Sequence, residues 1–116
     1  MNKTIICIFL LSLTSISYAE KKMTKNDMIE AVCGDASEFA QQVMQQRQSG
    51  ETITNLIKNT NSRNLPEPKN SFYKSIIYNA YKVPVSSDSS DKKISSEYSN
   101  HVFMTCSEEF TKVLSE

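Results

Sequence analysis

The residues with the clearest capacity for chemistry in this sequence are its three cysteines, Cys7, Cys33 and Cys106. Cys7 lies in an apolar N-terminal run that we expect to be removed, which leaves the other two. Two cysteines in an exported chain of this size are most simply a structural disulfide. The alternative is a redox or nucleophilic thiol, but such a thiol usually has a resolving cysteine or a base nearby, and no Cys-x-x-Cys arrangement is present. We therefore predict a bridge between Cys33 and Cys106.

Other groups that could act as catalysts or metal ligands are sparse. The single histidine, His101, precedes Val102 at the edge of an apolar stripe, which is typical of a flanking surface residue. One histidine and two bridged cysteines are too few ligands for a structural zinc site. Glu108 and Glu109 point about 100 degrees apart on a helix, so they cannot act on one substrate as an acid/base pair. The sequence therefore predicts no catalytic residue, no metal site and no cofactor site. We expect that the protein is not an enzyme.

Three residues are candidates for contact with another molecule: Arg47, Gln48 and Tyr81. Arg47 and Gln48 stand among glutamines, in a stretch poor in opposing charge. The competing interpretation of Arg47 is a cation near a helix C-terminus, where the macrodipole favours it. Tyrosine supplies amphipathic contact area at protein surfaces, although helical tyrosines are more often half-buried in a core.

Apolar residues at steps of three and four predict the helices that must position these groups. The first helix, about 25 to 48, begins with a capping box at Thr24 and Asp27 and ends before Gly50. A short second helix is expected at about 52 to 60. The first apolar stripe comprises Met28, Ile29, Val32, Cys33, Ala36, Phe39, Ala40, Val43 and Met44.

The second half of the chain predicts two more helices. Four asparagines and two prolines in residues 59–70 predict an exposed loop. A third helix is expected at about 71 to 82, before Pro84, and a fourth at about 92 to 114, with Ser90 or Asp91 as its N-cap. The fourth stripe comprises Ile94, Tyr98, Val102, Phe103, Cys106, Phe110, Val113 and Leu114. No alternating strand pattern is present, so the fold class is all-α, a small bundle of about four helices tied by one disulfide.

The N-terminus predicts export. Lys3 is followed by an apolar run from Ile5 to Leu13 and by the small-residue pattern Ser17-x-Ala19, which together are typical of a cleavable signal peptide over residues 1–19. Polar residues interrupt the run well before the roughly 20 apolar residues that a membrane span needs, so we expect no anchor after cleavage. Residues 20–116 then form a single domain, periplasmic or secreted.

Composition excludes two classes of ligand. The formal net charge is zero, with 13 basic and 13 acidic residues, so the chain lacks the basic footprint of a nucleic-acid-binding protein. Two glycines are too few for a glycine-rich phosphate-binding loop. We expect neither nucleic acid nor nucleotides as ligands.

Several of these residues also carry a resemblance. In order they are Cys33, Val43-Met44-x-x-Arg47-Gln48-x-Gly50, Ile77-x-x-Ala80-Tyr81-x-x-Pro84, Tyr98 and Phe103-x-x-Cys106. This pattern resembles a group of small signal-bearing hypothetical proteins of proteobacteria and their phages, from which the chain departs by a longer Asn/Pro loop. The group has no assigned biochemical function. The resemblance implies an exported helical domain and carries over no site.

Three classes of function follow. The favoured hypothesis is a protein-interaction module in the bacterial periplasm, with another protein as its partner. One form of it is an inhibitor or immunity protein against an envelope-acting toxin, by analogy in helical class and export with the immunity proteins that block type VI secretion amidases, whose motifs are not matched. The alternatives are a carrier of a small apolar ligand, which would show a large internal cavity, and an envelope enzyme.

Overall fold

The computed structural model describes residues 22–87 and 90–114, and within these ranges the chain forms four helices and no strand. The helices are α1 (Lys25–Gln48), α2 (Ile53–Ser62), α3 (Lys69–Ala80) and α4 (Asp91–Leu114). The predicted all-α fold with one disulfide is confirmed. The predicted signal peptide, residues 1–19, lies outside the described residues.

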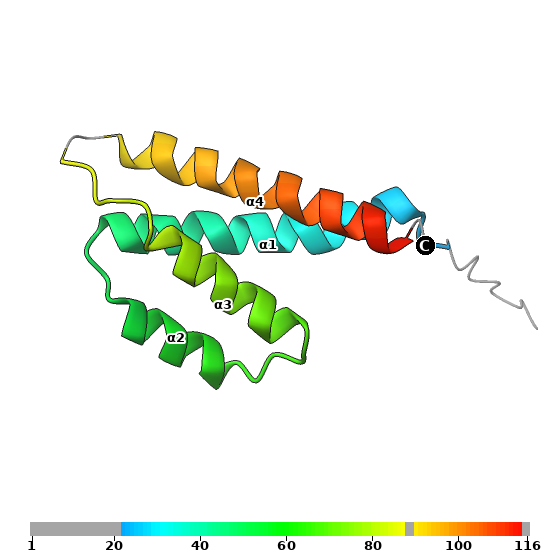
Figure 1. Ribbon diagram of the computed structural model, residues 1–116, viewed down its shortest axis with the longest axis horizontal. Helices are drawn as coiled ribbons and strands as arrows, with labels where there is room; N and C mark the ends of the chain where they lie inside the picture. Colours follow the sequence, from blue (N-terminus) through cyan, green and yellow to red (C-terminus); the bar gives the residue numbers. More distant parts are fainter. Residues whose placement is uncertain (1–21, 88–89, 115–116) are drawn as a thin grey trace, which may run out of the picture.

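The two long helices form the central pair of the fold. Figure 1 shows α1 and α4 side by side and antiparallel, with α3 against α1 and α2 beyond α3. From its contact near the C-terminal end of α1, the α2–α3 hairpin slants away towards the end where α1 begins. As a result, the start of α1 and the end of α4 extend past the hairpin as a layer of two helices.

Both ends of α1 follow the local signals in the sequence. The backbone N–H of Asp27 donates to Thr24 Oγ1 over 3.1 Å, and the Asp27 carboxylate accepts from the Thr24 N–H over 3.2 Å, which completes the capping box. At the other end Gly50 has φ 94°, a conformation that glycine adopts without a Cβ clash. The N–H groups of Gly50 and Glu51 donate to the carbonyls of Arg47 and Gln46, the pattern of a Schellman motif.

The predicted loop over residues 59–70 is too long, because both neighbouring helices extend into it. The second helix continues through Ser62, and the third begins at Lys69 rather than at Ser71. Asparagine has a low helix propensity, but tertiary packing overrides it where the opposite face of the helix is buried, as at Leu56 and Thr60. Only residues 63–68 connect α2 to α3.

An acidic side chain placed before α3 explains its early start. The Glu67 carboxylate accepts hydrogen bonds from the N–H of Ser71 over 3.3 Å and from the Ser71 hydroxyl over 2.6 Å. It therefore supplies the acceptor that the unpaired N–H groups of a helix N-terminus require. The hydrogen bond from the Ser71 side chain and that from Asn70 lower the pKa of Glu67.

The core lies where α3 crosses the α1–α4 pair. Its largest fully buried side chains include Met44 and Ile77. Towards the open end of the pair, Cys33 of α1 and Cys106 of α4 are buried and form the predicted disulfide, with an S–S distance of 2.09 Å. The bridge therefore ties the two longest helices together beyond the start of α3.

The predicted apolar stripes are only partly buried. Ala36, Ala40 and Met44 are fully buried, but Val32 is 43% exposed and Val113 is 67% exposed. These valines lie on the part of the α1–α4 pair that extends past the hairpin. The stripes do not face a core there, because no third helix of the described residues covers that part.

Candidate functional site

Arg47, one of the predicted contact residues, binds the connector between α3 and α4. It stands in the last turn of α1, and its Nε donates to the backbone carbonyl of Val83 over 3.3 Å. Its guanidinium carbon lies 4.6 Å from the centroid of the Tyr81 ring, within the range of a cation–π contact. Arg47 therefore has partners inside the chain.

Gln48 binds the same connector with both ends of its amide. Its Nε2 donates to the carbonyl of Pro84 over 3.0 Å, and its Oε1 accepts from the N–H of Ser86 over 2.7 Å. Only 8% of the residue is exposed. The buried amide of Gln48 holds the connector in place. Because its nitrogen and its oxygen both have partners within the chain, it has little hydrogen-bonding capacity for a ligand.

Tyr81 completes this cluster. Its hydroxyl donates to the backbone carbonyl of Glu51, which follows the C-cap of α1. Burial raises the pKa of the Tyr81 hydroxyl, against the opposing effect of Arg47. The three predicted contact residues are thus brought together, in an arrangement we call the clasp: Arg47, Gln48 and Tyr81 join the end of α1 to residues 81–86. Their role in contacting a partner stays a prediction.

A second region of the described residues, nearer the start of α1, offers more exposed apolar surface for binding than the clasp does. A groove of about 570 Å³ runs between the α1–α4 layer and the start of α3, and it is open to solvent. Its lining is almost entirely apolar, with charged residues beside it. The lining residues are Val32, Asp35, Pro68, Lys69, Phe72, Tyr73, Cys106, Glu109, Phe110 and Val113.

Aromatic contacts pack the α3 wall of the groove against α1. The Tyr73 ring stacks on Phe39 of α1 with ring centroids 4.5 Å apart, and it meets Phe72 edge-on at 6.2 Å. The ammonium group of Lys69 lies 5.4 Å from the centroid of the Tyr73 ring. Burial, with a smaller contribution from Asp35, raises the pKa of Tyr73. Tyr73 is therefore a neutral, apolar part of the wall at physiological pH.

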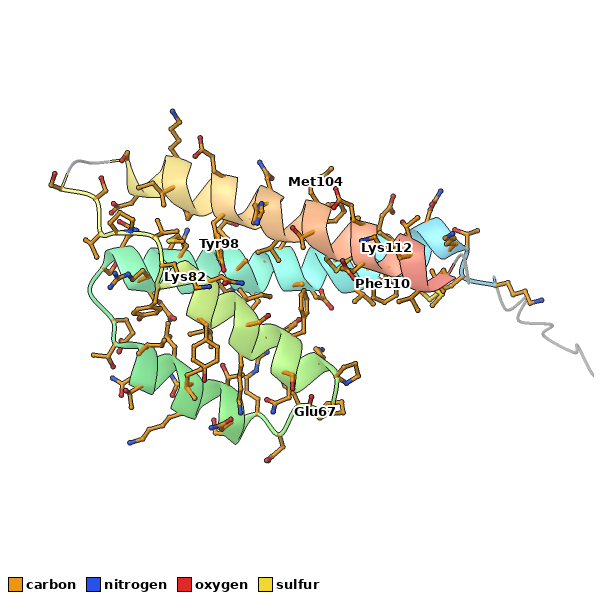
Figure 2. The ribbon with its side chains drawn as sticks, viewed as in Figure 1. Glu67, Lys82, Tyr98, Met104, Phe110 and Lys112 are labelled. Carbon is orange, nitrogen blue, oxygen red and sulfur yellow. A yellow bond between two sulfur atoms is a disulfide. The ribbon has the colours of Figure 1, made fainter. Side chains whose placement is uncertain are left out.

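The opposite wall comes from α1 and α4. Figure 2 shows Phe110 on the side of α4 towards α1 and Met104 on its outer side. The disulfide lies in this wall, since Cys106 lines the groove. Glu109 forms an ion pair with Lys112 at 3.5 Å, and both side chains are well exposed. Such an exposed pair contributes little to stability and is easily rearranged by a ligand.

The two walls carry opposite charge. The open part of the α1–α4 layer, residues 25–38 and 101–114, holds six carboxylates and two lysines, whereas residues 53–80 of the hairpin hold four cations and one carboxylate. The acidic residues of the layer are Asp27, Glu30, Asp35, Glu38, Glu108 and Glu109, and its lysines are Lys25 and Lys112. The charged residues of the hairpin are Lys58, Arg63, Glu67, Lys69 and Lys74. The charged residues that line the groove follow the same division, with Asp35 and Glu109 on the α1–α4 side and Lys69 on the α3 side.

The remaining candidates for chemistry stay apart. His101 is exposed on α4. Across the parts of the chain that the structure describes, no three His, Cys, Asp or Glu residues gather as a metal-binding group.

The sequence contained a signal for the groove that the stripe pattern alone did not reveal. Two helices of 24 residues are each about 36 Å long, whereas a 12-residue helix is about 18 Å long. Short helices cannot cover the full apolar stripes of long ones. An uncovered stretch was therefore to be expected at one end, although its position depends on the hairpin angle.

The chain was compared with protein-family models, with curated proteins and with solved structures, and no match was found. Within the described ranges, no helix has both the length and the apolar character needed to cross a bilayer.

Proposed function

We propose that this protein is a protein-interaction module of the bacterial periplasm and that it binds its partner in the groove between the α1–α4 layer and α3. The observation that carries the proposal is the uncovered apolar stripe. Val32 and Val113 occupy positions at which a soluble helix pair would normally bury its side chains, yet both are exposed. Contiguous apolar surface of this kind, flanked by charged residues, is typical of binding sites.

The shape of the groove supports a protein partner over a small ligand. Sites for small molecules usually enclose most of the ligand surface. Here the groove is open, and its apolar surface continues along α4 to residues near the end of the helix. A partner that brings its own apolar surface can cover such a stripe completely.

Export is part of the proposal. The signal-peptide pattern of residues 1–19 supports it, and so does the disulfide between Cys33 and Cys106, since disulfides persist in oxidising compartments. In the periplasm the disulfide would keep α1 and α4, which form one wall of the groove, in register while a partner binds and leaves.

The test is affinity capture of the tagged mature protein from periplasm, with two matched variants. Val113→Glu places a charge in the groove, whereas Met104→Glu places the same charge on the outer side of α4, where the side chain is 59% exposed. Wild type and Met104→Glu should retain the same partner, and Val113→Glu should lose it. If all three proteins retain it equally, the groove is not the binding site. A captured toxin that acts on the envelope would identify the inhibitor or immunity form of this function.

A second candidate is a carrier of a small apolar ligand, favoured by the groove volume of about 570 Å³. This value lies within the range of roughly 300–1,000 Å³ that is common for small-molecule sites. The environment-sensitive dye N-phenyl-1-naphthylamine provides the test. Saturable fluorescence enhancement with the wild type, lost in Val113→Glu, would favour the carrier.

A further inference from the structure

We propose that the segment which fills the groove is an amphipathic α-helix of the partner, with basic residues along the edge that meets α1 and α4 and acidic residues along the edge that meets α3. The inference rests on the proposed protein-binding function and adds the chemistry of the occupant. It is carried by three properties of the groove: its apolar lining, its length and the opposite charges of its walls.

The apolar lining requires an occupant whose backbone is already hydrogen-bonded. Both walls are helices, so their backbone N–H and C=O groups in the helix interiors are paired within each helix. An extended peptide in this groove would find no edge to pair with and would bury unpaired backbone groups at considerable cost. A helix satisfies its own backbone and presents only side chains. A partner helix therefore fits this lining, and an extended strand does not.

The length of the groove surface corresponds to about two helical turns. The groove lining and the exposed apolar residues next to it extend on α4 from Cys106, which is itself buried, to Leu114, and on α1 from Met28 to Asp35. At 1.5 Å per residue these stretches are about 12 Å and about 10 Å long. A helix lying along them, beside the start of α3, would cover the part of the α1–α4 layer that the hairpin leaves open.

The charges of the walls determine which residues flank the apolar face of the occupant. Asp35 and Glu109 line the groove from α1 and α4, and Lys69 lines it from α3. These groups belong to walls with acidic and basic excess, respectively. A helix with Lys or Arg along one edge and Glu or Asp along the other complements both walls at once. Electrostatic complementarity of this kind mainly provides specificity and speed of association.

The same charges argue against a second copy as the occupant. Two copies that buried their uncovered stripes against each other would bring two acidic layers together, because each layer has six carboxylates and two lysines. Like charges at an interface oppose association. The occupant is therefore expected to come from a different protein.

The test uses three synthetic helices of 14 residues, hydrocarbon-stapled because free peptides of this length are only marginally helical. All three have the same leucine face. The mixed peptide has lysines along one edge and glutamates along the other, the acidic peptide has glutamates along both edges, and the basic peptide has lysines along both. Binding to the full mature protein is measured by isothermal titration calorimetry at low salt. The mixed peptide should bind roughly tenfold more tightly than either of the others.

Variants then test whether the groove and its charges cause this preference. In the double variant Asp35→Lys and Glu109→Lys the charged residues that line the groove are lysines on both sides, and the α1–α4 layer as a whole loses its acidic excess. The order should therefore change, and the acidic peptide should bind most tightly. Both positions are exposed, so the fold should be retained. Val113→Glu should abolish binding of all three peptides, and Met104→Glu should leave their affinities unchanged.

Each contrary result has a distinct meaning. Equal affinity of the three peptides would overturn the assignment of charged edges, as would an unchanged order in the double variant. Failure of all three peptides, while periplasmic capture stays sensitive to Val113→Glu, would overturn the helical occupant and leave the proposed function standing. A dimer in sedimentation that Val113→Glu dissociates would identify a second copy as the occupant and overturn the inference.

Discussion

Tyr98 shows how a single polar group is accommodated in this core. It is buried between α4 and α3, and its hydroxyl donates to the backbone carbonyl of Ile76. Burial raises the pKa of Tyr98 to about 12. The neutral hydroxyl is compatible with this position because its one proton has an acceptor, whereas the phenolate would lose both solvent and hydrogen bond.

The elevated pKa predicts a loss of stability at alkaline pH. From about pH 10 the tyrosine of the unfolded chain ionises while folded Tyr98 stays protonated, so stability that is complete below pH 10 declines as the pH approaches 12. Two pKa units correspond to about 2–3 kcal/mol. Urea unfolding between pH 8 and pH 11.5 should show a smaller alkaline decline for Tyr98→Phe than for the wild type. Tyr78→Phe, at an exposed position of α3, is the matched control and should follow the wild type.

A second prediction for a single residue concerns the contribution of Gln48 to stability. Gln48→Ala removes the amide that accepts from the Ser86 N–H and donates to the Pro84 carbonyl, and the loss of these two hydrogen bonds should cost about 1–3 kcal/mol of unfolding free energy. Gln45→Ala removes the same side chain from an exposed position of α1 and should change stability by less than about 0.5 kcal/mol. Chemical denaturation of both variants is the measurement. Equal effects would mean that the clasp does not stabilise the connector.

At the scale of the element, the disulfide joins two helices whose ends extend past the rest of the bundle. Cys33 and Cys106 are separated by 73 residues in sequence. In the chain-entropy model, closing such a loop stabilises the fold by roughly 4 kcal/mol. The contribution matters most at the open end, where α1 and α4 are held only by each other.

Removal of the disulfide should therefore have a large effect on stability. Cys33→Ser should lower the unfolding midpoint by roughly 10–30 °C, as should reduction of the wild type, and Cys106→Ser added to it should contribute little more. Calorimetry with and without reductant measures this. Peptide or partner binding should fall only in step with folding. Loss of binding by a fully folded serine variant would instead give a thiol a direct role.

At the scale of the whole molecule, export predicts both the N-terminus and the oxidation state of the mature protein. If residues 1–19 are removed on export, protein isolated from periplasm should begin at Glu20, and its intact mass should match residues 20–116 with two hydrogens fewer for the disulfide. Intact mass spectrometry with and without reductant measures both at once. A mass that includes Met1 would contradict cleavage, and an unchanged mass on reduction would contradict the bridge.

Much of this protein was predictable from local sequence. The periodic apolar residues determine four helices, the capping box at Thr24 and the glycine at position 50 determine the ends of α1, and two cysteines on apolar stripes determine the bridge. The helices and their ends depend on interactions within a few residues. The pairing of Cys33 with Cys106 was predicted from the expected loss of Cys7 with the signal peptide. The loop over residues 59–70 was predicted less well, because helix ends rich in asparagine depend on what their opposite face packs against.

Only the tertiary structure decided what the surface residues do. The sequence predicts Arg47, Gln48 and Tyr81 as contact residues. In the structure their partners are carbonyl and N–H groups of segments 30 to 38 residues away, which no local pattern reveals. The groove likewise results from tertiary packing. Phe72 and Phe110 are ordinary core residues by their spacing, and it is the angle of the α2–α3 hairpin to the α1–α4 pair that leaves them along an open groove. That angle results from the packing of side chains across three helices, and periodicity within one helix contains no information about it.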